Sequence, residues 1–154
     1  DYTYRRPSRR QHAVRGVVLP AMQRPLLEVA IVVDTSDSIG DDELGIALHE
    51  VQTILRHGGV ANLRVYFANT RIVHEALVRT PAEAVRIFRQ LRGGGGTDMG
   101  VAVREAMLKR PRPHAVVVIT DGVTPWGDAP QCRVPVIALI TPRGRVSTGT
   151  HPWG

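Results

Sequence analysis

Oxygen-bearing side chains follow directly after an apolar stretch near the start of the chain. Residues 27–33 are almost entirely apolar, and a run of hydroxyl and carboxylate side chains follows at positions 34–38. Asp34, Ser36 and Ser38 stand at alternate positions, so they leave a strand end together. Such oxygens suit Mg²⁺, Ca²⁺ or Mn²⁺ and suit Zn²⁺ poorly. The stretch predicts a hard-cation site, but it is equally typical of a helix N-cap, where Ser and Asp are preferred.

A second aspartate repeats this design later in the chain. Residues 114–120 form another apolar, β-branched run, which stops at Asp121. Between the two runs, four glycines at positions 93–96 precede Thr97 and a predicted helix start. The carboxyl ends of parallel strands are where such sheets bind ligands, so we expect these groups to converge. The predicted set has two carboxylates and three hydroxyls: Asp34, Ser36, Ser38, Thr97 and Asp121.

Hydrophobic periodicity predicts the elements that must position this set. Buried or alternating apolar runs indicate five strands, at about residues 27–34, 63–68, 72–78, 114–120 and 134–140. Helical periods and capping signals indicate three helices, at residues 40–57, after the Thr80-Pro81-Ala82-Glu83 capping box, and at about 98–109. Strands alternating with helices favour an α/β fold with a doubly wound, mostly parallel, Rossmann-like sheet. The turn at residues 69–71 is short enough for a hairpin, which makes strand 72–78 an antiparallel edge strand.

Length and composition favour one globular domain. The 154 residues are 43% hydrophobic and 22% charged, and no apolar run approaches a membrane span. We expect a lead-in at residues 1–26, with a short strand at 14–19, then a domain at 27–141 and a tail at 142–154. That tail shows at most a short strand at 145–147, so the fold is reduced at its C-terminal end. Because the chain begins without methionine, we interpret it as part of a larger protein.

A single cysteine, Cys132, excludes an internal disulfide and a multi-cysteine zinc site. It fits a cytoplasmic protein, and no signal peptide is visible. The formal net charge is +6, and the basic residues are nearly all arginines spread along the chain. A local cluster at residues 5–10 is typical of a nucleic-acid arm, a solvated tail or a link to another domain. Of these three interpretations of the cluster, nucleic-acid binding is the one that we favour least.

The three motifs together resemble a von Willebrand factor A-type (VWA-like) domain with a metal-ion-dependent adhesion site (MIDAS). The family pattern D-x-S-x-S, loop threonine and strand-end aspartate is matched by Asp34, Ser36, Ser38, Thr97 and Asp121. The resemblance covers roughly residues 27–140. It implies that the hydroxyls ligate Mg²⁺ (or Mn²⁺ or Ca²⁺) directly and that the aspartates do so directly or through water. One coordination position would stay open for a carboxylate of a protein partner.

Three segments resemble more specifically the bacterial A-like domains found C-terminal to a metallopeptidase-like region and associated with MoxR-type AAA+ ATPases. They are Arg-Arg-Pro-Ser-Arg-Arg in the lead-in, Gly-Gly-Gly-Gly-Thr-Asp and Thr-Asp-Gly-Val-Thr-Pro-Trp. This resemblance implies a protein partner in a MoxR-type system. One departure is Asp37, where the family commonly has glycine. Its carboxylate can strengthen metal binding, compete with a partner's acid or point to solvent, and we favour the last.

The rival function is a metal-dependent hydrolase or phosphotransferase on a similar sheet. Haloacid-dehalogenase-type enzymes also place an aspartate after a buried strand, but they need a second aspartate two residues later, where this chain has Ser36. Lys109, the only lysine, is predicted at the far end of its helix. Neither His74 nor His114 belongs to an acid–nucleophile pattern. We therefore expect a binding module without catalytic residues.

Overall fold

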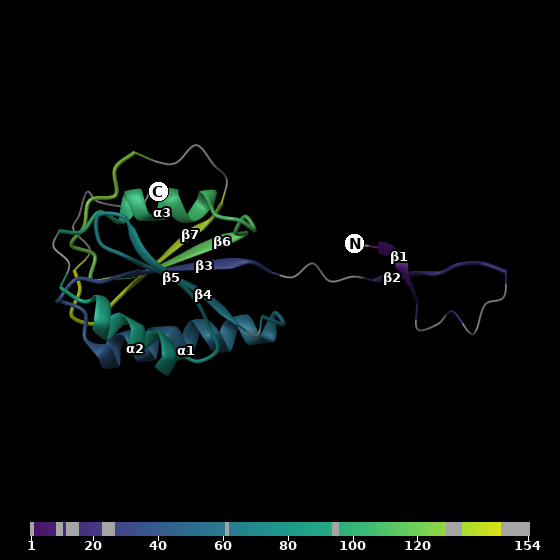
Figure 1. Ribbon diagram of the computed structural model, residues 1–154, viewed down its shortest axis with the longest axis horizontal. Coiled ribbons are helices and arrows are strands. Elements are labelled where there is room, and N and C mark those ends of the chain that lie inside the picture. Colours follow the sequence, from purple (N-terminus) through teal and green to yellow (C-terminus); the bar gives the residue numbers. More distant parts are fainter. Residues whose placement is uncertain are drawn as a thin grey trace.

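The computed structural model of the chain describes residues 2–8, 11, 16–22, 27–60, 62–93, 96–128 and 134–145. Within these residues a five-stranded sheet lies between two helices on one face and one on the other (Figure 1). Its strands are β3 (Val29–Asp34), β4 (Leu63–Ala68), β5 (Ile72–Val78), β6 (Ala115–Thr120) and β7 (Val136–Ile140). The helices are α1 (Asp41–His57), α2 (Pro81–Leu91) and α3 (Met99–Leu108).

The strand order is β5-β4-β3-β6-β7. All neighbouring pairs are parallel except β4 and β5, which form an antiparallel hairpin. This confirms the predicted mostly parallel α/β sheet with one antiparallel edge strand. From β3 the chain runs outward to β4 and β5, then returns to β6 on the other side of β3. The carboxyl ends of β3 and β6 are therefore neighbours at the point where the order reverses, which is where such sheets open a crevice.

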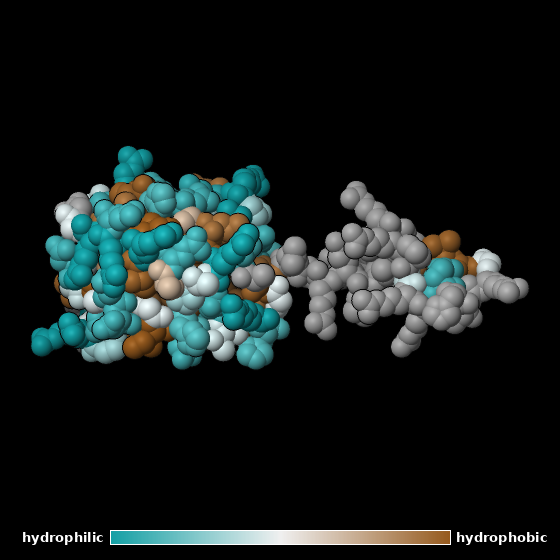
Figure 2. Space-filling view, turned by 60° about the horizontal axis from the view of Figure 1, so that its bottom comes forward, coloured by the Kyte–Doolittle hydropathy of each residue, from teal (hydrophilic) through white to brown (hydrophobic). Residues whose placement is uncertain are grey.

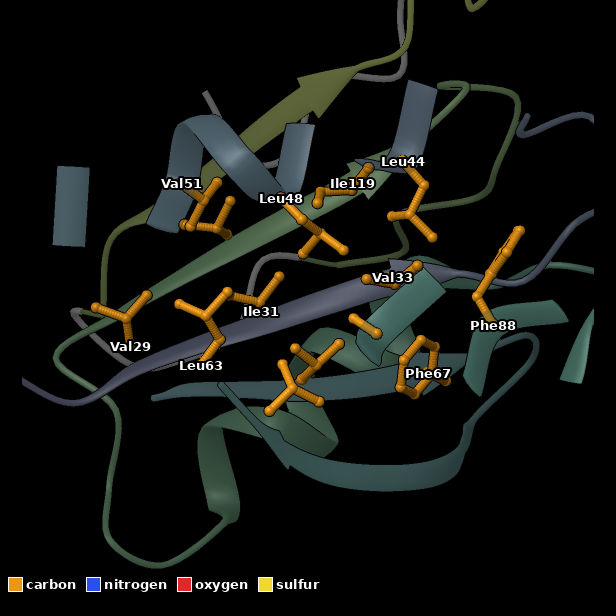
Figure 3. Close-up of a cluster of buried hydrophobic side chains, with 14 of the residues drawn as sticks. Val29, Ile31, Val33, Leu44, Leu48, Val51, Leu63, Phe67, Phe88 and Ile119 are labelled. Carbon is orange, nitrogen blue, oxygen red and sulfur yellow. The ribbon is translucent and has the colours of Figure 1, made fainter. Parts of the chain in front are cut away.

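Alternate residues of the central strands build two separate cores, because successive side chains of a strand point to opposite faces. On β3, Ile31 and Val33 pack with α1 and α2, whereas Ala30 and Val32 pack with α3. Figure 3 shows α1 side chains such as Leu48 directed onto the first of these faces. Each fully buried Val, Leu or Ile side chain contributes about 1.5–3 kcal/mol. A one-residue slip of β3 would exchange the two cores, so its register is strongly specified.

Capping groups at the three helix starts explain where each helix begins. The Glu43 side chain accepts a hydrogen bond from the Gly40 backbone at the start of α1 (3.1 Å). Thr80 accepts one from the Glu83 backbone at the start of α2 (3.3 Å), as the capping box predicted. At the start of α3, the Asp98 carboxylate accepts one from the Val101 backbone (3.0 Å). All three helices lie within two residues of their predicted positions.

The segment before the sheet differs from the prediction. Among the described residues 16–19 there is no strand; instead β1 (Tyr2–Pro7) pairs antiparallel with β2 (Pro20–Met22) in a two-stranded sheet of its own. We expected Pro20 to end a strand because proline cannot donate to a ladder. It stands instead as the first residue of β2, a position that the same rule allows. Residues 14 and 15 lie outside the described part.

At the other end of the chain, Arg145 is not in a strand, and residues 146 and 147 of the strand predicted there lie outside the described part. With α1 and α2 brought forward, the surface is a mosaic of hydrophilic residues and separate hydrophobic patches (Figure 2). The exposed apolar side chains of α1 are Ile46 and Ile54. Among the described helices, none combines the length and the apolar character needed to cross a membrane.

We predict opposite effects of alanine at two helical glycines. A Cβ at Gly100 in α3 would lie 1.8 Å from the Trp126 carbonyl oxygen, so the backbone must shift and Gly100→Ala should cost about 1–3 kcal/mol. A Cβ at Gly45 in α1 would meet only Val85, at 3.8 Å, so Gly45→Ala should stabilise the fold by up to about 1 kcal/mol. Urea unfolding measures both. Equal effects of the two substitutions would contradict the close packing at Gly100.

Candidate functional site

The Asp34 carboxylate is completely inaccessible at the carboxyl end of β3. The register pairs Val33 with Ile119, so Asp34 and Thr120 follow as the next pair on the face of α3. The Thr120 hydroxyl donates a hydrogen bond to Asp34 Oδ2 (2.8 Å). The Ser36 backbone N–H donates to Asp34 Oδ1 (2.9 Å), which turns the chain sharply after the strand. Both carboxylate oxygens are therefore held by groups on two different strand ends.

The loop after β3 is fixed at both of its ends. Thr35 donates from its backbone N–H (2.9 Å) and from its hydroxyl (3.1 Å) to the Ala68 carbonyl at the end of β4. Ile39 is fully buried in the core under α1. Between these anchors the hydroxyls of Ser36 and Ser38 lie 2.8 Å apart. The structure thus brings the two predicted serines together beside Asp34, with Asp37 exposed between them.

Asp121 follows β6 and lies next to the β3 end. Its carboxylate accepts a hydrogen bond from the Val123 backbone (2.9 Å), and it is close enough to Asp34 for its charge to raise the Asp34 pKa. The segment after β7 crosses directly over it. Arg145 N–H donates to the Asp121 carbonyl (2.8 Å), and a Cβ at Gly144 would lie 2.4 Å from that carbonyl oxygen. Backbone contacts therefore hold this aspartate from two sides.

Thr97 lies at the same end of the sheet but is not joined to the other four residues by a hydrogen bond among the described residues. The next residue, Asp98, donates from its backbone to the Asn69 carbonyl at the end of the β4–β5 hairpin (2.9 Å). Met99 N–H donates to the Thr124 hydroxyl in the loop after β6 (3.0 Å). These contacts place the Thr97 loop against the β4–β5 turn and the loop after β6, at the carboxyl end of the parallel strands. Residues 94 and 95 lie outside the described part.

The electrostatics of Asp34 are unfavourable for a carboxylate. Burial raises the pKa of Asp34 above its ordinary value, and the nearby Asp121 charge raises it further. Hydrogen bonds from the Ser36 backbone, from Thr120 and from the Ser36 side chain lower the pKa, but they do not cancel the desolvation. No arginine, lysine or histidine of the described chain forms an ion pair with Asp34. A buried carboxylate without a cationic partner fits a site whose cation comes from solution.

The chemistry of the donor set agrees with a hard cation. The described residues contain no cluster of three or more His, Cys, Asp or Glu side chains placed to hold a metal. A cation here would therefore depend on hydroxyl oxygens as well as on Asp34 and Asp121. Hydroxyl and carboxylate oxygens are ligands for Mg²⁺, Mn²⁺ or Ca²⁺, since these hard ions prefer oxygen.

Two residues of this region were missed by sequence reasoning. Thr120 holds Asp34, and the only signal for it was its place before Asp121, at the end of a strand that had to pair beside β3. Arg92, at the end of α2, forms an ion pair with Asp37 (3.5 Å). Asp37 is largely exposed, as we favoured, but its carboxylate is also paired. No sequence signal joins Arg92 to a residue 55 positions earlier.

We predict that Asp34→Asn raises the free energy of unfolding of the domain in chelator at pH 7. Asparagine carries no charge, so the desolvation that raises the carboxyl pKa no longer opposes folding. A carboxyl whose pKa is raised in the folded state stabilises the fold below its ordinary pKa of 3.8, and this contribution is lost as the pH rises. The advantage of the variant should therefore shrink as the pH falls toward 3.8.

Urea unfolding of both proteins between pH 4 and pH 7 measures this difference. Asp128→Asn, which removes an exposed carboxylate, is the control and should change little across this range. If Asp34→Asn were less stable than the wild type at pH 7 in chelator, the unfavourable ionisation of Asp34 would be refuted.

Comparison with known proteins identifies a family. The family model of the VWA-like domain (DUF2201) matches residues 29–154, which is most of the chain. No curated protein matches the chain, and no solved structure does. The matched range begins at the first residue of β3 and includes every element of the five-stranded sheet. The chain therefore belongs to the family of VWA-like domains.

Proposed function

We propose that this VWA-like domain is a protein-interaction module that uses a MIDAS-type divalent metal site. The observation that carries the proposal is the buried Asp34 carboxylate, which has Asp121 near it, two hydroxyls 2.8 Å apart beside it and no basic partner in the described chain. A buried carboxylate without a cationic partner lowers the stability of the fold, and a bound cation would offset this loss. Membership of the family supports interaction as the general role.

Each predicted residue has a role in this proposal. Ser36, Ser38 and Thr97 would ligate the ion through their hydroxyls, and Asp34 and Asp121 would ligate it directly or through water. When bound, Mg²⁺ would supply an electrophilic position for an incoming carboxylate, since most of its protein ligands are neutral. The loop anchors at Thr35 and Ile39 keep the two serines side by side before the ion arrives, which lowers the ordering cost of binding.

The partner, in this proposal, is a protein that offers an Asp or Glu side chain to the site. A MoxR-type AAA+ ATPase system is the partner that the sequence resemblance favours, together with a bacterial origin and a metallopeptidase-like region elsewhere in the parent protein. These finer points depend on the resemblance of three segments, which are Arg-Arg-Pro-Ser-Arg-Arg in the lead-in, the glycine-rich loop and Thr-Asp-Gly-Val-Thr-Pro-Trp.

The contacts of the described residues favour a binding module over a hydrolase or phosphotransferase. Lys109 donates to Glu75 (3.1 Å) and lies over the Tyr66 ring at the C-terminal end of α3. His114 accepts a hydrogen bond from the Glu28 backbone before β3 (3.1 Å), at the opposite end of the sheet from Asp34. These side chains are therefore occupied away from the site.

We predict that Mg²⁺ stabilises the domain against unfolding. At about 100 times its dissociation constant, an ion that binds only the folded chain should add roughly 2.7 kcal/mol. Thermal melts in chelator and in Mg²⁺, Mn²⁺ or Ca²⁺ measure the effect. Asp34→Ala should abolish the shift, and Asp42→Ala, which removes an exposed carboxylate of α1, should preserve it. A wild type that responds to none of the three ions would contradict the metal site.

We also predict that capture of a protein partner needs both the ion and a partner carboxylate. Immobilised wild-type domain should retain the partner in Mg²⁺ and release it in chelator, whereas Thr97→Ala should not retain it. One Asp→Asn or Glu→Gln substitution in the partner should abolish retention, because an amide oxygen is a weaker ligand than a carboxylate. Retention that survives every such substitution would exclude carboxylate recognition.

A further inference from the structure

The guanidinium of Arg92 joins the end of α2 to the loop that carries Ser36 and Ser38. Arg92 follows α2, and its backbone N–H still donates to the Phe88 carbonyl (2.9 Å). Its side chain donates a hydrogen bond to the Asp37 backbone carbonyl and lies 3.5 Å from the Asp37 carboxylate. Another of its nitrogens lies 3.9 Å from Asp41 Oδ1, in the first turn of α1. Its Cζ lies 5.8 Å from the centre of the Phe88 ring.

These contacts act on the peptide between the two serines. Asp37 stands between Ser36 and Ser38, so holding its carbonyl and its carboxylate together fixes the direction in which the two hydroxyls leave the chain. The planar fork of arginine presents its donors to two acceptors in a fixed geometry, whereas the lysine ammonium is a compact charge on a flexible stem. The next residue adds a backbone bond, from Gly93 N–H to the Thr35 carbonyl (3.3 Å). The end of α2 thus holds the serine loop at two successive positions.

The same segment leads to the third hydroxyl. Thr97 follows Arg92 by five residues, on the loop that connects α2 to α3. Arg92 and Gly93 therefore contact the serine loop at the start of the segment that leads to Thr97. The positive charge of Arg92 also compensates Asp37, the carboxylate that departs from the family pattern.

We propose that Arg92 is a positioning residue of the metal site, which holds the Ser36–Ser38 loop in the geometry that binds a divalent cation. This inference rests on the proposed function. A purely structural alternative is that Arg92 only ties α2 to α1. Arg89 offers a matched control for that alternative, since it stands one turn earlier on α2 and pairs with Asp41 at 2.6 Å. In the described structure Arg89 forms no hydrogen bond or ion pair with the serine loop.

The test compares Arg92→Ala, Arg92→Lys and Arg89→Ala in the full chain. Mn²⁺ and Mg²⁺ affinities are measured by calorimetry, and hydrogen exchange of the Ser36 and Ile39 amides is measured in chelator. Loss of a group that orients metal ligands typically weakens metal affinity by about 10–100-fold, so we expect Arg92→Ala to lose at least about tenfold. Arg89→Ala should bind as the wild type does. Arg92→Lys, with the charge but not the fork, should fall between.

In the absence of metal, Arg92→Ala should also speed exchange of the two loop amides, and Arg89→Ala should not. Unchanged or tighter metal binding in Arg92→Ala, or equal losses in both alanine variants, would overturn the positioning role while leaving the metal site intact. A wild type that binds neither ion would overturn the proposed function. In that case faster exchange in Arg92→Ala would reduce Arg92 to a structural anchor, and this inference would fail as well.

Discussion

The pairing of β3 with β6 is the interaction on which the rest of the site depends. It places Asp34 and Thr120 side by side as the last residues of two buried strands, and it brings Asp121 within electrostatic reach of Asp34. The desolvation of this carboxylate is a local cost. Burial of the apolar side chains on both faces of β3 offsets this cost. Because all six residues of the strand are buried and closely packed, Asp34 cannot move into solvent without disturbing its neighbours.

The loops around Asp34 are then held by the strands that flank β3. β4 accepts both Thr35 bonds through the Ala68 carbonyl, and the β4–β5 hairpin accepts the Asp98 amide. In the loop after β6, the Thr124 hydroxyl accepts a hydrogen bond from the Met99 N–H at the start of α3. The serine loop and the Thr97 loop are thus both anchored where β4 ends, and the start of α3 is also bonded to the loop after β6, so the site depends on the order of the sheet.

The repeating elements were predictable from sequence because their signals are local. An apolar run that stops at an aspartate indicated both β3 and β6, and the Thr80 to Glu83 capping box located the start of α2. The site was predictable only as a set of residue types at strand ends. The Asp34–Thr120 bond spans 86 positions and the Arg92–Asp37 contact spans 55, so neither leaves a local pattern. Strand β2 was missed because Pro20 was interpreted as the end of a strand, although proline is allowed at the start of a strand as well.

The close crossing of Gly144 and Arg145 over Asp121 has a practical consequence for attachment. Residues that precede β3 join the domain at the amino end of that strand, which is remote from Asp34 and Asp121. The chain after β7 passes directly over Asp121 at Gly144 and Arg145. An affinity tag, dye or surface linker added after Arg145 is therefore anchored at the rim of the proposed site. One placed before Glu28 is separated from it by the length of β3, so immobilisation through the N-terminal side keeps the support away from Asp121.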